Sequence, residues 1–430
     1  MVSSKLIELK VSKHTHNISK TLVNLPMQKE LSHPFGNARW TDELILSTYY
    51  QSSTGKNPSN GLNYKTGKSN GGFDRLQFKI NQNTFKEDSN EDYDISLTLN
   101  GRGRIPDKKL SLPVYGGGMS LGSVSLNFIL SRATAAKRLD TLTCTGEGGY
   151  PEELVPLKDY VITQLATGMF GVSEKTLQHT PMVEFKYAQG AKPGLGGHLL
   201  ADKVTLEVSR LRESPVNTSL YSPFPFHSVY SVEDHKKHLD WVSTINPKAL
   251  LSVKVATPKD VEMVAIGSYF AGANVVHLDG AFGGTGAAPE IAKKNIALPV
   301  EYAIPLVHKY FIEEGVRDNI TLIASGGIRT AYDVAKAIAL GADGCVIGTS
   351  EAVAVGCVHC GNCESGRGCQ IGIATSDEEL SKFIKVEWGA QRIVNMYTAW
   401  KQQWNDLLHH FGLNSIKELR GRKDLLVYKK

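Results

Sequence analysis

From about residue 110 onward, the sequence repeats one pattern: a short apolar segment that ends in glycine or a polar residue, then a stretch of helical periodicity. Strands that alternate with helices form parallel sheets, and eight such units in roughly 240 residues favour an α/β fold of the closed (β/α)8 TIM-barrel type. The alternative is an open doubly wound sheet, but residues 116–122 match its glycine fingerprint poorly. The segments predicted as barrel strands are 112–115, 142–145, 183–188, 220–222, 250–255, 275–278, 320–324 and 344–347.

The barrel pattern divides the chain into three parts. Residues 1–105 are rich in Asn, Ser, Lys and Gly, and we interpret them as an irregular N-terminal extension with two short strands, near 76–80 and 93–99. Residues 106–385 form the predicted barrel domain, which includes a cysteine cluster at 357–369. From about Glu378 the pattern is helical, and residues 386–430 are predicted to pack as a C-terminal helical segment against the barrel.

Charge and hydropathy exclude some classes of function. The net charge of +5 is mild, and no stretch is basic enough to follow a nucleic-acid backbone, so we expect no nucleic-acid partner. There is no run of 18 apolar residues, so we expect no membrane span. The chain starts Met1-Val-Ser-Ser-Lys, without the apolar core of a secretion signal. These features predict a cytoplasmic protein.

Glycines follow the last two predicted strands, at the end of the barrel where ligands bind. The residues are Ser325-Gly326-Gly327 and Gly348-Thr349. Glycines let backbone N–H groups approach a ligand, and a helix N-terminus attracts anions. Ordinary strand-to-helix turns would also explain these residues, but phosphate sites in barrels often lie at these two loops. Glycine-rich loops over a flat ligand then indicate FMN as the cofactor.

Three cations surround the third predicted strand. Lys186 and Lys192 flank a glycine-rich loop, and Arg212 follows on the next helix. A dicarboxylate substrate needs two positive poles, and the arginine fork suits a carboxylate. Solvated surface lysines are the alternative interpretation. The position of the two lysines at the catalytic end of the barrel favours a ligand site.

Four of the six cysteines fall within thirteen residues, which in a cytosolic protein indicates metal binding and not disulfides. Their spacing, Cys-x2-Cys-x2-Cys followed by a fourth cysteine, resembles iron–sulfur loops, although four thiolates also suit zinc. Cys144 and Cys345 lie in apolar strands and are predicted to be core residues. The clustered cysteines are Cys357, Cys360, Cys363 and Cys369.

Five motifs occur in the order typical of one family. They are Gly-Met-Ser-Leu-Gly-Ser at 118–123, Thr-Gly-Glu-Gly-Gly at 145–149, Ala-Gln-Gly-Ala-Lys-Pro-Gly-x-Gly-Gly at 188–197, Gly-Gly-Thr-Gly-Ala-x-Pro at 283–289, and Cys-x5-Cys-x5-Cys-x-Ile-Gly-Ile-Ala-Thr at 357–375. Together they resemble the FMN-binding synthase domain of glutamate synthase, in particular its short archaeal type, over about residues 110–385.

The resemblance implies reductive amination of 2-oxoglutarate to glutamate through 2-iminoglutarate by an FMN-dependent oxidoreductase. It implies that Glu147, Lys186 and Lys254 are catalytic, with Glu147 beside substrate and flavin and Lys254 near the flavin N1–O2 edge. The implied ligands of 2-oxoglutarate are Lys186, Gln189, Lys192 and Arg212. The implied flavin contacts are Gly118, Met119, Ser120, Lys254, Ser325, Gly326, Gly327, Gly348 and Thr349.

Three departures from larger family members stand out. His198 replaces a glutamine, Ala281-Phe282 replaces His-Asp, and Cys360 adds a fourth cysteine to the family's three cluster ligands. Three ligands fit a 3Fe–4S cluster, whereas four allow a 4Fe–4S cluster. The chain also lacks an N-terminal glutaminase cysteine, so we expect ammonia from a separate glutaminase subunit and electrons from a donor subunit or ferredoxin.

Three other functions stay open at this point. An N-methylglutamate synthase-type subunit would use an alkylamine with nearly the same pocket. A non-catalytic flavin and iron–sulfur electron-transfer subunit would not bind 2-oxoglutarate. An FMN oxidase of 2-hydroxy acids would need a catalytic histidine and an arginine pair near the last strands, and we find neither there.

Overall fold

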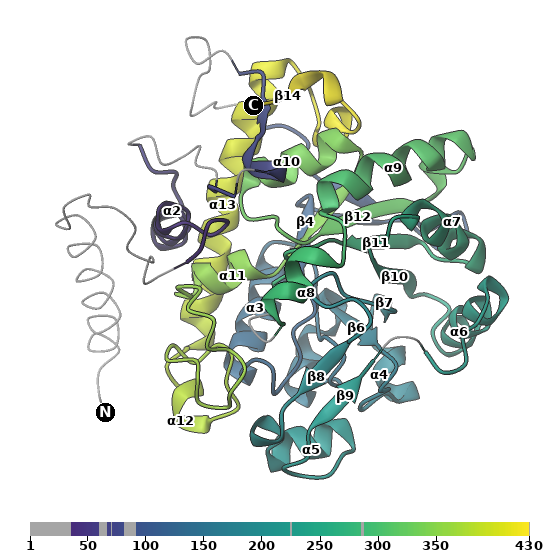
Figure 1. Cartoon of the computed structure of the whole chain (residues 1–430), viewed down its shortest axis with the longest axis vertical. Helices are drawn as coiled ribbons and strands as arrows, with labels where there is room; N and C mark the ends of the chain where they lie inside the picture. Colours follow the sequence, from purple (N-terminus) through teal and green to yellow (C-terminus); the bar gives the residue numbers. More distant parts are fainter. Residues whose placement is uncertain are drawn as a thin grey trace.

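The apolar segments of the chain assemble into a barrel of eight parallel strands with helices around it (Figure 1). A computed structural model describes residues 36–59, 67–69, 71–80, 92–223, 226–284 and 288–429. Residues 1–35 of the predicted extension, and 285–287 of the fourth motif, lie outside these ranges. The barrel strands are β4 (Val114–Gly116), β5 (Thr143–Cys144), β6 (Val161–Leu165), β7 (Met182–Lys186), β10 (Leu250–Ala256), β11 (Val275–Asp279), β12 (Thr321–Ser325) and β13 (Gly344–Ile347).

Parallel pairing runs through the whole sheet, in the order β4-β13-β12-β11-β10-β7-β6-β5. The two end strands also meet. Gly118 forms a parallel bridge with Cys144, and the Gly116 backbone N–H donates to Leu142 O at 2.8 Å. The sheet is therefore closed, as the sequence pattern predicted, and all strand ends of one kind lie at the same mouth.

Helices between the strands cover the barrel, and short polar side chains fix where many of them begin. Ser125 caps α3 and Thr330 caps α10, where each hydroxyl accepts a hydrogen bond from a backbone N–H of the first turn. The helices between the first barrel strand and the cysteine loop are α3 (Leu126–Arg138), α4 (Glu174–Gln178), α5 (Leu206–Arg212), α6 (Val232–Ile245), α7 (Val261–Ala271), α8 (Glu290–Asn295), α9 (Val300–Glu313), α10 (Ala331–Leu340) and α11 (Thr349–Ala354), with 3-10 turns at Glu152–Tyr160, Ala201–Lys203 and Arg317–Asn319.

One predicted barrel strand was wrong. Leu220–Ser222 does form a strand, β9, but it pairs antiparallel with β8 (Gly197–Leu199) in a hairpin outside the barrel. The strand that takes its place in the barrel is β6, Val161–Leu165, which the sequence analysis missed. Thr163 and Gln164 make β6 look polar, but both side chains are buried and hydrogen-bonded. Lys186 therefore ends the fourth barrel strand, not the third.

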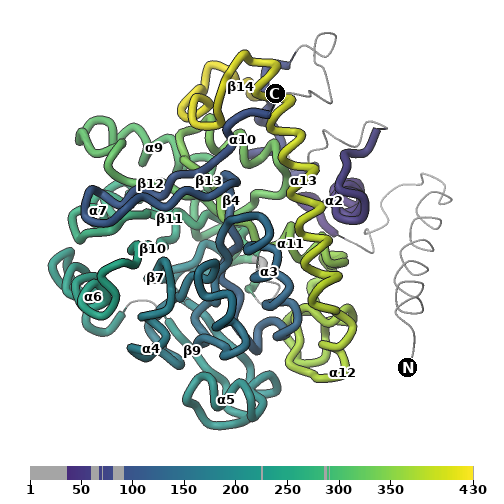
Figure 2. Tube along the Cα trace, turned by 180° about the vertical axis from the view of Figure 1, so that it is seen from behind, coloured from purple at the N-terminus to yellow at the C-terminus, as the bar shows by residue number. Residues whose placement is uncertain are grey.

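Short strands outside the barrel include one pair that joins the N-terminal part of the chain to its C-terminal part. β1 (Leu76–Phe78) pairs antiparallel with β14 (Leu426–Tyr428), and β2 (Leu97–Leu99) pairs with β3 (Lys108–Leu110). The two strands predicted in the extension are thus confirmed, each over a shorter range than predicted. Figure 2 shows the long helix α13 (Val386–Phe411) along one side of the barrel, next to α3 and α2 (Asp42–Thr54). The remaining elements are α12 (Glu378–Ser381) and 3-10 turns at Gly72–Asp74, Ile416–Leu419 and Lys423–Leu425.

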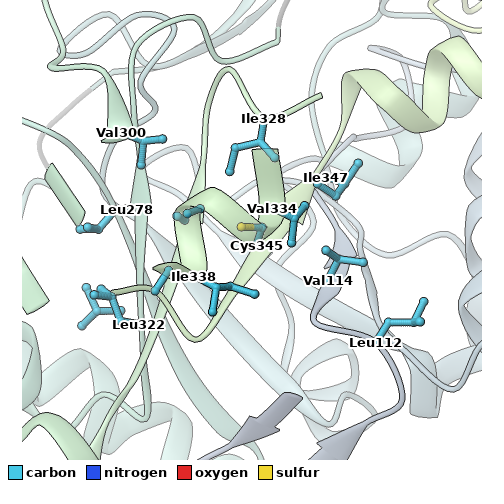
Figure 3. Packing of buried hydrophobic residues seen from close by; sticks show 14 of the residues in the cluster. Leu112, Val114, Leu278, Val300, Leu322, Ile328, Val334, Ile338, Cys345 and Ile347 are labelled. Carbon is cyan, nitrogen blue, oxygen red and sulfur yellow. The ribbon is translucent and has the colours of Figure 1, made fainter. Parts of the chain in front are cut away.

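The largest core cluster fills the space between the barrel strands and their helices (Figure 3). Leu322 of β12 and Ile338 of α10 belong to it, and both are almost fully buried. Cys345 lies in the same cluster, and Cys144 is buried in a second one, as predicted for core residues. Within the described part of the chain, no helix combines the length and apolarity needed to cross a bilayer.

Candidate active site

Glu147 and Lys186 form an ion pair at the carboxyl end of the barrel strands. Lys186 Nζ lies 3.0 Å from Glu147 Oε1, and their side chains are 8% and 12% exposed. Burial alone would raise the pKa of Glu147, but Lys186 and Arg212 hold it below its usual value. The nearby Ser222 hydroxyl also lowers this pKa. Glu147 Oε2 is buried and has no hydrogen-bond partner among the described residues. This oxygen therefore retains an unused capacity to accept a hydrogen bond.

Arg212, the last residue of α5, is buried beside this pair. One of its terminal nitrogens donates to Ser120 Oγ and to Leu121 O, both at 2.9 Å. Burial lowers the pKa of Arg212 to about 10, although Glu147 opposes the shift. Its Nε has no hydrogen-bond partner in the described structure. A buried guanidinium with an unused donor suits an oxyanion ligand.

Lys192 contacts an imidazole instead of a carboxylate. Its Nζ lies 2.6 Å from His198 Nδ1, and the other ring nitrogen of His198 lies 3.8 Å from Glu364 Oε1. Burial, together with Lys186, lowers the pKa of Lys192 to about 8. Burial and Lys192 also lower the pKa of His198, which favours the neutral ring that accepts from Lys192. Sequence reasoning missed Glu364, because its only local signal is its place next to Cys363.

Lys254 heads a polar chain in the barrel interior. Its Nζ lies 3.3 Å from Asp279 Oδ2, and Asp279 Oδ1 accepts a hydrogen bond from Ser325 Oγ at 2.5 Å. Burial would lower the pKa of Lys254, but Asp279 and Glu184 raise it above its usual value. Lys254 is thus held as a cation, next to Lys186 across the β10–β7 register.

His277 continues this chain deeper into the barrel. Its Nε2 lies 2.7 Å from Ser325 Oγ and its Nδ1 lies 2.9 Å from Glu184 Oε2. Gln164 Nε2 donates to the other oxygen of Glu184 at 2.7 Å. None of these inner residues was predicted, because polar side chains on separate strands carry no mutual signal in the sequence. They fix the Ser325 hydroxyl by a hydrogen bond on its buried side, and the charge of Glu184 helps to raise the pKa of Lys254.

The glycine loops after β12 and β13 leave little room for side chains. Gly326 and Gly327 have φ angles of +98° and +75°, and a Cβ at Gly326 would lie 2.5 Å from Gly280 O. A Cβ at Gly348 would meet only Met119 Cε, at 3.4 Å, so the space above Gly348 is open on its other sides. Gly118 packs against Gln164 in the same region, where a Cβ would lie 2.9 Å from Nε2. These glycines are partly exposed, and together they form a glycine-lined surface beside Met119.

The four clustered cysteines lie in one loop after α11. Burial raises the pKa of the Cys357 thiol to about 12, the His359 backbone N–H opposes this shift, and the other three cysteines add to it. No three His, Cys, Asp or Glu side chains in the described ranges converge closely enough for a single metal ion. Lys203 Nζ donates to Cys363 O at 2.6 Å and anchors this loop. Through Glu364, the loop also reaches His198 and hence Lys192.

A separate, mostly apolar cavity of about 430 Å³ lies between the loop after β7 and helices α6 and α7. Tyr187 and His235 line it, with ring centroids 4.4 Å apart. None of the predicted site residues lines this cavity. The charged cluster around Glu147, not this cavity, is therefore the candidate active site.

Fold and site together define a (β/α)8-barrel protein whose carboxyl mouth holds buried cations, a glycine-lined surface and a cysteine loop. The family model described as "Conserved region in glutamate synthase" matches residues 61–414. The chain therefore belongs to the glutamate synthase family.

Two relatives illustrate how far the likeness extends. The archaeal-type glutamate synthase (NADPH) of Thermotoga maritima is 43% identical over 75% of this chain and 63% of its own length. That of Dehalococcoides mccartyi is 39% identical over 90% of this chain and 80% of its own. The chain thus matches less than two thirds of the length of the first of these. Among solved structures, a mutant flavocytochrome b2 with benzoylformate has a TM-score of 0.49 at 14% identity, over 90% of this chain and 79% of that one.

Proposed function

We propose that this chain is the FMN and iron–sulfur synthase subunit of a glutamate synthase, which converts 2-oxoglutarate to glutamate through 2-iminoglutarate. The observation that carries the proposal is an excess of buried positive charge at the barrel mouth. Lys186, Lys192 and Arg212 are all at most 8% exposed, and only Lys186 has an ion-pair partner within the described residues. A ligand with two carboxylates would balance this charge in a chain of this family.

The side chains of the site would contact different groups of the substrate. Lys192 and Arg212 each offer a buried donor to a carboxylate, and Gln189, also buried, lies on the same loop as Lys192. Lys186 is held by Glu147 Oε1, and its remaining N–H bonds would be donated to the substrate carbonyl. Glu147 Oε2 is left to accept a hydrogen bond from ammonia or from the imine N–H. Glu147 would thus orient the nitrogen, while Lys186 would stabilise the negative charge that forms on the carbonyl oxygen as ammonia adds. The two protons that this oxygen needs to leave as water come from the added nitrogen, which keeps one hydrogen in the imine.

FMN fits the glycine-lined surface. Bound FMN would supply the hydride that reduces the imine carbon. Gly118, Met119 and Ser120 would lie along the flavin ring, and Lys254 would place its charge near the ring's N1–O2 edge. The phosphate would lie at Ser325, Gly326, Gly327, Gly348 and Thr349. The open space above Gly348 and the positive φ angles of the two neighbouring glycines support this assignment.

An iron–sulfur cluster fits the cysteine loop better than zinc does. Cluster cysteines bind different iron atoms and need not converge on one point, whereas the four thiolates of a structural zinc site do. Cys357, Cys363 and Cys369 would be ligands, and Cys360, the most exposed of the four, would decide between a 3Fe–4S and a 4Fe–4S cluster. A bound cluster would supply single electrons from a donor subunit or ferredoxin. Ammonia would come from a separate glutaminase subunit.

The test is a flavin titration joined to a turnover assay. The purified holoprotein should carry FMN, and added 2-oxoglutarate should perturb the flavin absorbance. With a reduced low-potential donor and ammonium, it should form glutamate. Methylamine in place of ammonium separates the alkylamine variant, because faster N-methylglutamate formation would reassign the amine. Protein that holds FMN but shows neither a response to 2-oxoglutarate nor glutamate formation would overturn the proposal.

A further inference from the structure

An arginine of the N-terminal segment lies on the loop surface where β11 and β12 end. The Arg39 guanidinium carbon sits 3.2 Å from the centroid of the Phe282 ring, in the loop after β11. Both backbone groups of Arg39 are fixed: its N–H donates to Asn37 Oδ1 at 2.9 Å, and its carbonyl accepts from Arg329 Nη1 at 2.7 Å. The side chain is therefore held from two directions, by the Phe282 ring and by its own backbone.

The Arg39 guanidinium borders the second of the two glycines after β12. A Cβ built on Gly327 would lie 3.2 Å from Arg39 Nη1 and 3.8 Å from Phe282 Cβ. On the other side of the same surface, a Cβ built on Gly284 would lie 2.4 Å from Thr349 Oγ1. The loop after β11 thus connects Arg39 with both glycine loops. Arg39 lies about 290 residues away from Gly327 in the sequence, and no local pattern marks their contact.

Arg39 differs from its neighbour Arg329 in having no carboxylate partner. Arg329 pairs with Asp74 at 2.6 Å and with Asp333 at 3.0 Å. Arg39 forms no ion pair within the described residues, and its side chain is half-buried. Burial lowers the pKa of Arg39 and Arg329 lowers it further, while the more distant charges of Glu301, Asp74 and Asp333 oppose both. None of these carboxylates forms an ion pair with Arg39 among the described residues, and Asp74 and Asp333 are already paired with Arg329. An anion bound directly beside the half-buried guanidinium would therefore stabilise it.

We propose that Arg39 binds the phosphate of the flavin mononucleotide, and that Phe282 holds the guanidinium in place for this contact. The proposal rests on the proposed function, since it assigns the phosphate to the glycine loops. Backbone N–H groups supply directional hydrogen bonds but no net charge, whereas the phosphate is an anion. Arg39 supplies the charge from a segment outside the barrel. Flavin binding would then also tie that segment to the barrel.

A purely structural role for Arg39 is the competing explanation, and riboflavin separates the two. Riboflavin carries the same ring and ribityl chain as FMN but no phosphate. Loss of a phosphate contact weakens the binding of FMN only, whereas damage to the fold weakens the binding of both flavins. The dissociation constants of both flavins should be measured with protein from which the bound flavin has been removed, for the wild type and for Arg39→Met.

A matched control exists at the opposite end of the barrel. Arg102 stacks on Tyr269 at 3.9 Å and donates to Tyr269 O and Ala273 O, just before β11 begins. Arg102→Met removes the same kind of cation–ring contact far from the glycine loops. We expect Arg39→Met to weaken FMN binding about tenfold or more. Arg39→Lys should restore part of the FMN affinity, and Arg102→Met should leave this affinity unchanged. Riboflavin affinity should stay within about twofold in all three.

Each outcome decides the question. Unchanged FMN affinity in Arg39→Met, or equal losses for FMN and riboflavin, would overturn the inference while the proposed function stands. A wild-type protein that takes up neither flavin would instead overturn the proposed function, and the inference with it. If Arg39→Met does not fold, Phe282→Leu serves in its place, because this variant keeps the Arg39 guanidinium but removes the aromatic ring that holds it. Phe282→Leu should weaken the binding of FMN more than that of riboflavin. If the ratio of the two affinities is the same as in the wild type, the inference is wrong.

Discussion

Replacing Lys192 by methionine should stabilise the ligand-free protein and, at the same time, weaken its binding of 2-oxoglutarate. The residue is 3% exposed and forms no ion pair with any described residue, and its nitrogen contacts the imidazole of His198. Burial lowers the pKa of Lys192 from 10.5 to about 8, with a further contribution from Lys186. The folded protein therefore holds this proton less tightly than the unfolded chain does, which makes the charged lysine a destabilising group.

The magnitude follows from the pKa. A change from 10.5 to about 8 corresponds to an upper limit of about 3 kcal/mol in the free energy of unfolding. Solvent at the barrel mouth screens the charge, so we expect Lys192→Met to gain about 1–2 kcal/mol at pH 7. Loss of one charge-assisted hydrogen bond to a carboxylate should weaken 2-oxoglutarate binding roughly ten- to a hundredfold.

The pH dependence has a definite sign. Below pH 8 the lysine is protonated in both states, and the stability difference between variant and wild type is at its full value. Between about pH 8 and 10.5 the folded protein has released the proton and the unfolded chain has not, so the difference shrinks as pH rises. Above pH 10.5 it vanishes. Over the same range, the wild type should lose affinity for 2-oxoglutarate and approach the variant.

Urea unfolding and titration of the flavin absorbance with 2-oxoglutarate measure the two effects. Lys175→Met is a suitable control, because Lys175 is an exposed lysine in the short helix α4. It should change neither quantity. A Lys192→Met protein that is less stable than the wild type and binds 2-oxoglutarate normally would refute the reasoning, because Lys192 would then be a structural cation.

Three further predictions concern the rest of the site. Arg212→Ala should raise the Michaelis constant for 2-oxoglutarate roughly ten- to a hundredfold through the lost charge-assisted hydrogen bonds, with normal FMN content; an unchanged constant would place the substrate elsewhere. Metal analysis should find iron and acid-labile sulfide, and zinc without sulfide would contradict the assignment of an iron–sulfur cluster. The Cys360→Ser variant should keep both iron and sulfide if three cysteines hold the cluster, whereas loss of the cluster would favour four ligands. The isolated chain should form glutamate from ammonium and not from glutamine, because no cysteine is left to act as a nucleophile on glutamine. Cys144 and Cys345 are buried with raised thiol pKa values, and the other cysteines are assigned to the cluster. A faster reaction with glutamine than with ammonium would show a glutaminase activity.

Local patterns in the sequence were enough to predict the barrel. Buried parallel strands are almost wholly apolar, and β11 and β12 were found for this reason. The same rule failed at β6, whose Thr163 and Gln164 face polar partners inside the protein. It also could not tell that Leu220–Ser222 belongs to a hairpin, because a short apolar segment has the same pattern in either setting.

The sequence by itself determined which chemical groups stand at the barrel mouth. Glycine loops, cations and clustered cysteines are local features, since each depends on residue type and on spacing along the chain. Only the tertiary structure decided which groups act on one another. Glu364 reaches His198, and Arg39 reaches Gly327, across separations of 166 and 288 residues respectively. Charge interactions depend on distance through space and on burial, which are set when strands and loops from the whole chain pack at one mouth.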